Sequence, residues 1–215
     1  DTLSDMKKND YEKYLQFHKE FGRILKEGIH YDFSRKETLA DLLLFHSNKT
    51  GYDSFTTLEK YVEQMKEGQE EIYYITGADF NELVKSPYLE GFKEKDYEVL
   101  IMLDEIDDII MTNLYDYKGK KVKSVIKGDI KLDKTEESEQ TKKKYEKLID
   151  LMKEKLKDDV KDVRLSGRLK DSLCCLVAEE GDLDPQMEKI MKAMGQTIPG
   201  AKRILEINPS HPVIE

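Results

Sequence analysis

The sequence predicts an α/β protein in which a helical coil leads into a small αβα sandwich with a parallel sheet, followed by a mixed α+β domain. The run Ile72–Ile75 is short, β-branched and aromatic, and Val99–Leu103 is apolar throughout, as strands covered on both faces are. Segments with helical periodicity separate such runs, which favours parallel strands joined by helical crossovers. A polar run near residue 135 separates this part from the rest of the chain.

Helical spacing dominates the first third of the chain. A helix is expected over Ser4–Lys26 and should end at Gly28, because its apolar residues recur at helical spacing: Tyr14, Phe17, Phe21, Ile24 and Leu25. Ser34, followed by Glu37 three residues later, predicts a capping box. The helix that it opens is expected to carry Leu39, Leu42, Leu43 and Phe45. Thr57 is expected to begin another short helix.

Strands and helices then alternate. We expect strands at Ile72–Thr76, Glu98–Leu103 and Lys121–Ile126, and helices at Asp79–Lys85 and Glu105–Tyr115. The segment between Lys131 and Thr141 contains the polar run DKTEESEQ and is the best candidate for a linker, which divides the chain into domains 1–134 and 135–215. The second domain is expected to hold an amphipathic helix from Tyr145 to Leu156, a strand pair (Val160–Ser166 and Ser172–Ala178), a helix (Asp184–Met194) and a last strand (Arg203–Ile207).

The charge balance limits the class of function. There are 36 Lys and Arg against 45 Asp and Glu, and the net charge is −9. Because the two signs are interleaved, the chain lacks the concentrated basic face that nucleic acids require, and no nucleic-acid partner is expected. No apolar run is long enough to cross a bilayer and the acidic start DTLSD is no signal peptide, so we expect a soluble, cytoplasmic protein.

Cysteine and histidine patterns predict neither a disulfide nor a metal site. Cys174 and Cys175 are adjacent, so they point to opposite faces of a strand and are expected to act as small apolar residues in a reducing compartment. The four histidines have no metal-ligand spacing and form no triad with Ser or Cys. No catalytic, metal-binding or cofactor-binding residue is therefore predicted.

Two other patterns allow a functional and a structural interpretation. Gly77 lies between a strand and a helix, where α/β proteins often bind phosphate, but no glycine-rich fingerprint is present and Asp79 would repel a phosphate. A capped structural turn is therefore favoured. The acidic pairs Asp104/Glu105 and Asp107/Asp108 resemble a metal or acid–base site, but a helix start favours negative charge, so capping and a solvated face explain them better.

Two helices offer candidate binding surfaces. Four apolar residues form one stripe at helical spacing: Met187, Ile190, Met191 and Met194. Such stripes are often core, but the three methionines suit adaptable binding, and glycines and prolines flank the helix. In EIDDIIMTNLYDY the buried stripe is expected to be Ile106, Ile109, Ile110 and Leu114, which leaves Met111, Tyr115 and Tyr117 on other faces.

Six blocks in register resemble the ninety-kilodalton heat-shock chaperone family of bacterial type. The blocks are Phe21–Asp32, Tyr61–Gly77, Ser86–Leu100, Val163–Val177, Met187–Gln196 and Leu205–Ile214. This resemblance implies the later part of the middle domain (1–134) and a C-terminal domain (135–215) that lacks its last helices. It also implies an ATP-driven dimeric clamp that binds partly folded client proteins and works with co-chaperones.

The resemblance assigns roles to particular residues. Client contact is implied for Met187, Ile190, Met191 and Met194, and for the middle-domain residues Ile109, Met111 and Tyr115. ATP and magnesium belong to an N-terminal domain expected before Asp1, and Arg164 and Arg168 do not match the family's catalytic arginine. This chain is thus expected to be no enzyme and to dimerise weakly or not at all. Two alternatives are a nucleotide-binding α/β enzyme that uses the Gly77 turn and a purely structural connector.

Overall fold

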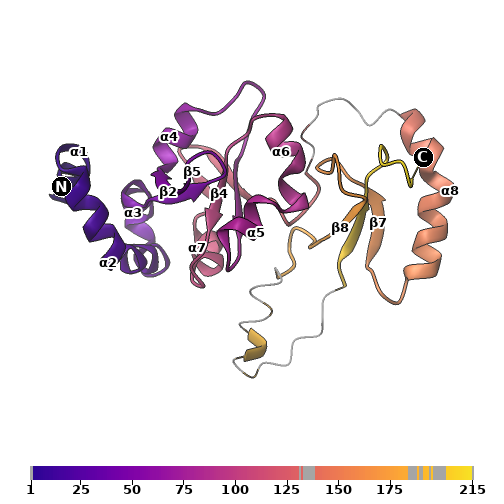
Figure 1. Ribbon diagram of the computed structural model, residues 1–215. Helices are drawn as coiled ribbons and strands as arrows, with labels where there is room; N and C mark the ends of the chain where they lie inside the picture. Colours follow the sequence, from indigo (N-terminus) through magenta and orange to yellow (C-terminus); the bar gives the residue numbers. More distant parts are fainter. Residues whose placement is uncertain are drawn as a thin grey trace. The chain divides into compact units, whose positions relative to one another are not determined.

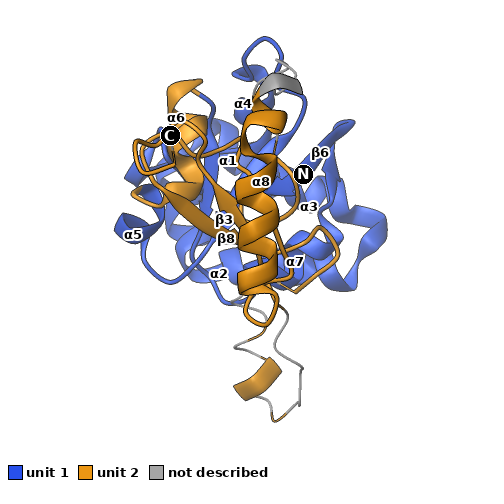
Figure 2. Cartoon of the chain, turned by 90° about the vertical axis from the view of Figure 1, so that its right-hand side faces the viewer, with its two compact units in different colours: residues 1–84, 97–124 blue, residues 85–96, 125–215 orange. Residues whose placement is uncertain are grey.

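The computed structural model describes residues 2–130, 132, 139–183, 188, 191–193, 195 and 202–214 (Figure 1). The chain forms two compact units (Figure 2): Asp1–Val84 with Tyr97–Ser124, and Lys85–Asp96 with Val125–Glu215. The predicted domain boundary between residues 134 and 135 stays a prediction. No described helix is long and apolar enough to cross a membrane.

The first unit begins with α1 (Thr2–Asn9) and α2 (Tyr11–Tyr31). The predicted single helix is wrong in two respects. It is interrupted at Asp10, whose carboxylate caps α2 by accepting a hydrogen bond from the Lys13 N–H, and it continues past Gly28. Gly28 lies inside the helix, at a point where the Leu39 side chain comes close to the backbone. A Cβ at Gly28 would lie 3.1 Å from Cδ1 of Leu39.

The next turn contains the short 3₁₀ helix η1 (Phe33–Arg35) and α3 (Lys36–Leu42). The predicted capping box at Ser34 is wrong. Asp32 caps η1 instead, because its Oδ1 accepts hydrogen bonds from the Arg35 N–H at 3.2 Å and from the Ser34 hydroxyl at 2.6 Å. The Ser34 hydroxyl thus donates to a residue that precedes it in the chain and does not cap α3. Helix α3 begins without a side-chain cap.

Strands β1 (Phe45–Ser47) and β2 (Gly51–Thr56) form a hairpin that the sequence did not reveal. Phe45, expected in a helix, lies in β1. The following α4 (Leu58–Glu63) starts as predicted, because the Thr57 side chain accepts a hydrogen bond from the Lys60 N–H. The hairpin was missed because β2 reads GYDSFT, which is too polar for a buried strand.

The sheet of the first unit has the strand order β2-β1-β4-β3-β6-β5. The predicted parallel crossovers are confirmed: β3 (Ile72–Thr76) pairs in parallel with both β4 (Val99–Met102) and β6 (Lys120–Ser124). Helices α5 (Phe80–Val84) and α7 (Asp107–Asn113) lie in the crossovers, and the short β5 (Asp116–Tyr117) pairs antiparallel with β6. All residues of β3 and β4 are buried, as their apolar composition predicts.

The second unit contains η2 (Pro87–Leu89), α6 (Glu90–Glu94), α8 (Glu139–Leu156) and a sheet of order β7-β9-β8. The predicted strand pair, β7 (Asp162–Leu165) and β8 (Cys174–Val177), is not a pair. Strand β9 (Ile204–Ile207) lies between them, parallel to β7 and antiparallel to β8. This order places the apolar side chains of β7 and β9 in one core with those of α8, including Tyr145, Val163, Leu165 and Ile207.

The segment Lys85–Asp96 is fixed within the second unit by one carboxylate. Glu90 Oε2 accepts hydrogen bonds from three successive backbone N–H groups, those of Lys170, Asp171 and Ser172, at 2.8, 2.9 and 3.1 Å. The Gly91 N–H donates to the Arg168 carbonyl at 2.8 Å, and a Cβ at Gly91 would come within 2.8 Å of the same oxygen. Helix α6 therefore docks against the loop between β7 and β8 through backbone contacts.

Candidate functional site

The Gly77 turn makes its contacts within the protein. The Gly77 N–H donates to the Met102 carbonyl at 3.1 Å, and a Cβ at Gly77 would lie 2.8 Å from Cδ2 of Leu83. Asp79 caps the following turn, because its Oδ1 accepts the Glu82 N–H at 2.9 Å. These contacts favour the capped structural turn over a phosphate site.

The acidic residues at the start of α7 form a buried ion-pair cluster instead of a solvated face. Asp107 and Asp108 are buried, which corrects the expectation for this pair. Lys26 Nζ, from α2, lies 2.5 Å from Asp104 Oδ2 and 2.7 Å from Asp107 Oδ1. Burial alone would lower the pKa of Lys26, but the two carboxylates outweigh it and keep the pKa above its ordinary value. The cluster joins two helices, and the described residues contain no group of His, Cys, Asp and Glu that would hold a metal ion.

A second buried charge cluster lies in the second unit and was not predicted. Arg168 is fully buried; its Nε donates to Glu206 Oε2 at 2.9 Å, and its Nη2 donates to the Gly128 carbonyl at 2.6 Å. The Glu206 carboxylate also accepts hydrogen bonds from the Ser166 hydroxyl at 2.9 Å and from Arg164 Nη2 at 2.7 Å. The available signal was the charged Glu206 inside the apolar strand ILEI. This cluster stabilises a loop and offers no open reacting group.

The cysteines lie in strand β8, as predicted. Cys174 is exposed, Cys175 is half-buried, and both are free thiols. Burial, and then the neighbouring Glu206, raises the pKa of the Cys175 thiol to about 12. A thiol with so high a pKa stays protonated at neutral pH and is a poor nucleophile.

His18 is expected to remain neutral well below neutral pH. Its Nε2 accepts a hydrogen bond from the Leu44 N–H at 3.2 Å, and burial lowers its pKa to about 4. Since the folded state binds this proton less well than the unfolded state, His18 favours folding above about pH 6.5, and the contribution is lost as the pH falls toward 4. NMR titration of the ring protons should show no transition between pH 8 and about 5. In urea the same ring should titrate near 6.5, and a native midpoint near 6 would contradict the assignment.

An exposed aromatic site surrounds the end of α7. Phe33 and Tyr115 are 63% and 55% exposed, and Lys36 Nζ lies 5.2 and 4.2 Å from their ring centroids. Lys36 also contacts Asp116 Oδ1 at 2.8 Å. These four side chains and the start of α3 line a hollow of about 380 Å³, which we call the aromatic hollow.

The structure separates the predicted surface residues of α7. Tyr115 lies on the aromatic hollow, and Ile109 is half-buried. Met111 and Tyr117, expected on outer faces, are in the core, so Met111 offers no surface in this conformation. Met111 was misplaced because α7 packs against α2, and Tyr117 because it lies in β5 of the sheet. Phe33 was missed, although an aromatic residue in the polar sequence YDFSRK was the available signal.

The methionine helix is only partly described. Met191 is half-buried, whereas Met187, Ile190 and Met194 lie outside the described residues. Glu188, in the same segment, contacts Arg203. The binding role of this stripe therefore stays a prediction.

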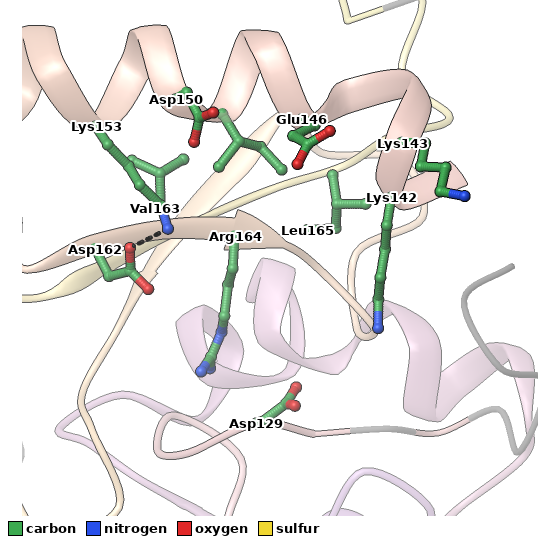
Figure 3. A pocket seen from close by; sticks show the side chains of 11 residues that line it. Asp129, Lys142, Lys143, Glu146, Asp150, Lys153, Asp162, Val163, Arg164 and Leu165 are labelled. Carbon is green, nitrogen blue, oxygen red and sulfur yellow. Dashed lines mark ion pairs between the residues drawn. The ribbon is translucent and has the colours of Figure 1, made fainter. Parts of the chain in front are cut away.

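A groove of about 400 Å³ lies between α8 and β7 in the second unit (Figure 3). Four basic and four acidic side chains line it, together with the apolar Ile149, Val163 and Leu165. Lys153 Nζ is paired with Asp162 Oδ1 at 2.8 Å, and Arg164 with Glu206. Because the two signs balance, the groove favours neither anionic nor cationic ligands.

Comparisons with known proteins agree on one family. A family model described as "Hsp90 protein" matches residues 1–215. The chain is 48% identical over its whole length to "Chaperone protein HtpG" of Geobacter sulfurreducens and 45% identical over 99% of its length to the protein of that name from Methylococcus capsulatus. The corresponding protein of Legionella pneumophila is 45% identical over 99% of this chain. The chain spans about a third of the length of these relatives, 34–35% of each.

Proposed function

Since this chain belongs to the family of Hsp90 proteins, we propose that it binds partly folded client proteins as one segment of an ATP-driven dimeric chaperone clamp. The relatives are named chaperones, which supports the functional class. The observation on this chain that carries the proposal is the aromatic hollow, where two large rings remain in water on a folded surface. Exposed apolar groups arranged around a hollow are typical of binding sites for other proteins.

The aromatic hollow suits weak and adaptable binding. Phe33 and Tyr115 supply apolar area, and the half-exposed Asp116, which is paired with the nearly buried Lys36, supplies a carboxylate at the rim. A partly folded chain exposes apolar side chains next to polar backbone groups, and the rings and the charges complement these two features. Tyr115 and the half-buried Ile109 thus remain proposed client contacts, joined by Phe33. The methionine stripe is proposed as a second contact, with Met191 as its described member.

The proposal predicts that replacing both rings weakens client binding without unfolding the protein. In the Phe33→Ser/Tyr115→Ser variant, affinity for an unfolded model protein should fall about tenfold, because apolar surface that a client would cover is lost. Stability should change by no more than about 1 kcal/mol, as for other exposed sites. Fluorescence anisotropy and urea unfolding measure the two effects.

A matched control is Tyr11→Ser. Tyr11 is an exposed aromatic at the opposite end of α2 from the aromatic hollow, so its loss should leave client affinity unchanged. Unchanged affinity in the double variant would leave the methionine stripe or the structural connector as the remaining interpretations.

We further propose that this chain does not act on ATP. Gly77 lies against Leu83, and its N–H already donates to the Met102 carbonyl, so this donor is not available to a phosphate. Calorimetric titration with ATP and magnesium should give no saturable heat. A micromolar dissociation constant would instead support the nucleotide-binding alternative. In the whole protein, ATP and magnesium are proposed to bind another domain, with homodimerisation, co-chaperones and a cytoplasmic location as in the resemblance.

A further inference from the structure

A small pocket lies at the carboxyl end of β4 in the first unit, with a volume of about 240 Å³. Its walls include His18, Lys26, His46, Tyr52, Phe55 and Asp104, from α2, the β1–β2 hairpin and the residue after Leu103. Open α/β sheets bind ligands at the carboxyl ends of parallel strands, and β4 is such a strand. Since pockets for drug-sized ligands have ~300–1,000 Å³, this one fits a single small group.

One wall of the pocket is aromatic. The rings of His46 and Tyr52 are stacked, with centroids 5.0 Å apart and planes at 9°, and the Phe55 centroid is 4.5 Å from that of His46. Tyr52 nevertheless stays 61% exposed. Aromatic faces attract cations, because their π-electrons carry a partial negative charge.

The polar wall consists of Lys26 and Asp104, which belong to a charge cluster with excess negative charge, although Asp107 of that cluster does not itself line the pocket. Two carboxylates, Asp104 and Asp107, contact the one ammonium group of Lys26. His18 adds no positive charge, because its Nε2 is used as an acceptor and burial keeps its pKa near 4. The Asp104 side chain is 52% exposed, so its carboxylate has room to accept hydrogen bonds from a ligand.

We propose that this pocket binds a planar organic monocation, a guanidinium or amidinium group, with Asp104 as its counter-ion and Tyr52 and Phe55 as its aromatic wall. A guanidinium group donates parallel N–H bonds to a carboxylate, and its plane stacks on aromatic rings. An anion would meet the excess negative charge, and a nucleotide exceeds the volume. The site shares no residue with the aromatic hollow, so the inference does not depend on client binding there.

The test is an NMR titration of this chain with N-acetyl-arginine amide, with the citrulline analogue as a neutral control of the same shape. The arginine compound should give saturable shifts in Tyr52 and Phe55, and the citrulline compound should bind about tenfold more weakly. Asp104→Asn and Tyr52→Leu should each weaken binding of the arginine compound several-fold. Tyr52→Leu keeps the test valid if Asp104→Asn disturbs Lys26, because the Tyr52 ring is largely exposed.

A control variant and a second ligand complete the test. Asp53→Asn removes an exposed carboxylate next to Tyr52 that does not line the pocket, so affinity should be retained. Methylguanidinium binding as tightly as the arginine compound would identify a small-molecule cation as the ligand, and weaker binding would identify an arginine side chain of a polypeptide. Equal affinity for arginine and citrulline, or no effect of either pocket variant, would overturn the proposal.

Discussion

Replacing Arg168 by methionine is expected to lower the free energy of unfolding by about 3–5 kcal/mol, because Glu206 is left buried without its main counter-charge. Arg168 is 0% and Glu206 1% exposed, so water cannot take the place of the guanidinium group. The Val125 carbonyl loses its charged donor in the same step, and the Gly128 carbonyl keeps the one from Arg164. Urea unfolding followed by circular dichroism measures the loss.

Arg164 provides the matched control for this prediction. It donates to the same Glu206 at 2.7 Å, but it is 26% exposed, so water can replace part of the interaction. Arg164→Met should therefore cost only about 1 kcal/mol. Arg168→Lys should not restore stability, because a single ammonium group cannot reach the carboxylate and both carbonyls. A loss below about 1 kcal/mol for Arg168→Met would show that the buried pair contributes nothing net.

Replacing Lys26 by methionine is the second change with a large expected effect, about 3 kcal/mol or more. The variant leaves Asp107, which is 0% exposed, without its ammonium partner. The folded-state pKa of Lys26 is raised above 10.5, so the ion pair stabilises the protein at neutral pH and the contribution is lost as the pH rises through that raised pKa. Unfolding experiments should therefore show an alkaline loss of stability in the wild type that Lys26→Met lacks.

Lys36 is the control for Lys26. Both lysine side chains are 9% exposed, but the partner of Lys36, Asp116, is 37% exposed and can be hydrated after the change. Lys36→Met is thus expected to cost about 1 kcal/mol or less. Equal losses in the two variants would mean that burial of the lysine stem, rather than the stranded carboxylate, determines the cost.

The sequence predicted the centre of the first sheet because its strands are apolar on both sides. Ile72–Thr76 and Val99–Met102 are buried throughout, and the short length of these apolar runs favours strands over helices. It did not predict the β1–β2 hairpin, because β2 lies at the sheet edge and its polar residues face water. Edge strands need no continuous apolar run, so periodicity cannot find them.

The charged clusters were missed for a different reason. Lys26, Arg168 and Glu206 are of residue types that usually lie on the solvated surface. Their ion-pair partners are distant in the sequence, and only the fold brings each pair together. The candidate site was found in part: Tyr115 lies on the aromatic hollow, but Met111 is core and Phe33 was not predicted. A ring on a short loop has no periodicity that would reveal its exposure.

The docking of α6 through Glu90 has a consequence for synthesis on the ribosome. Lys85–Asp96 leaves the ribosome between two parts of the first unit, yet its partners, the loop from Arg168 to Ser172, are made much later. Leu89 and Phe92 belong to this segment and are both 0% exposed in the complete fold, but the groups that hold Glu90 are absent until the second unit has been translated. A nascent chain that ends at Ser124 would carry this segment as an insertion between β3 and β4, and the contacts of Glu90 and Gly91 would form only after the second unit has been made.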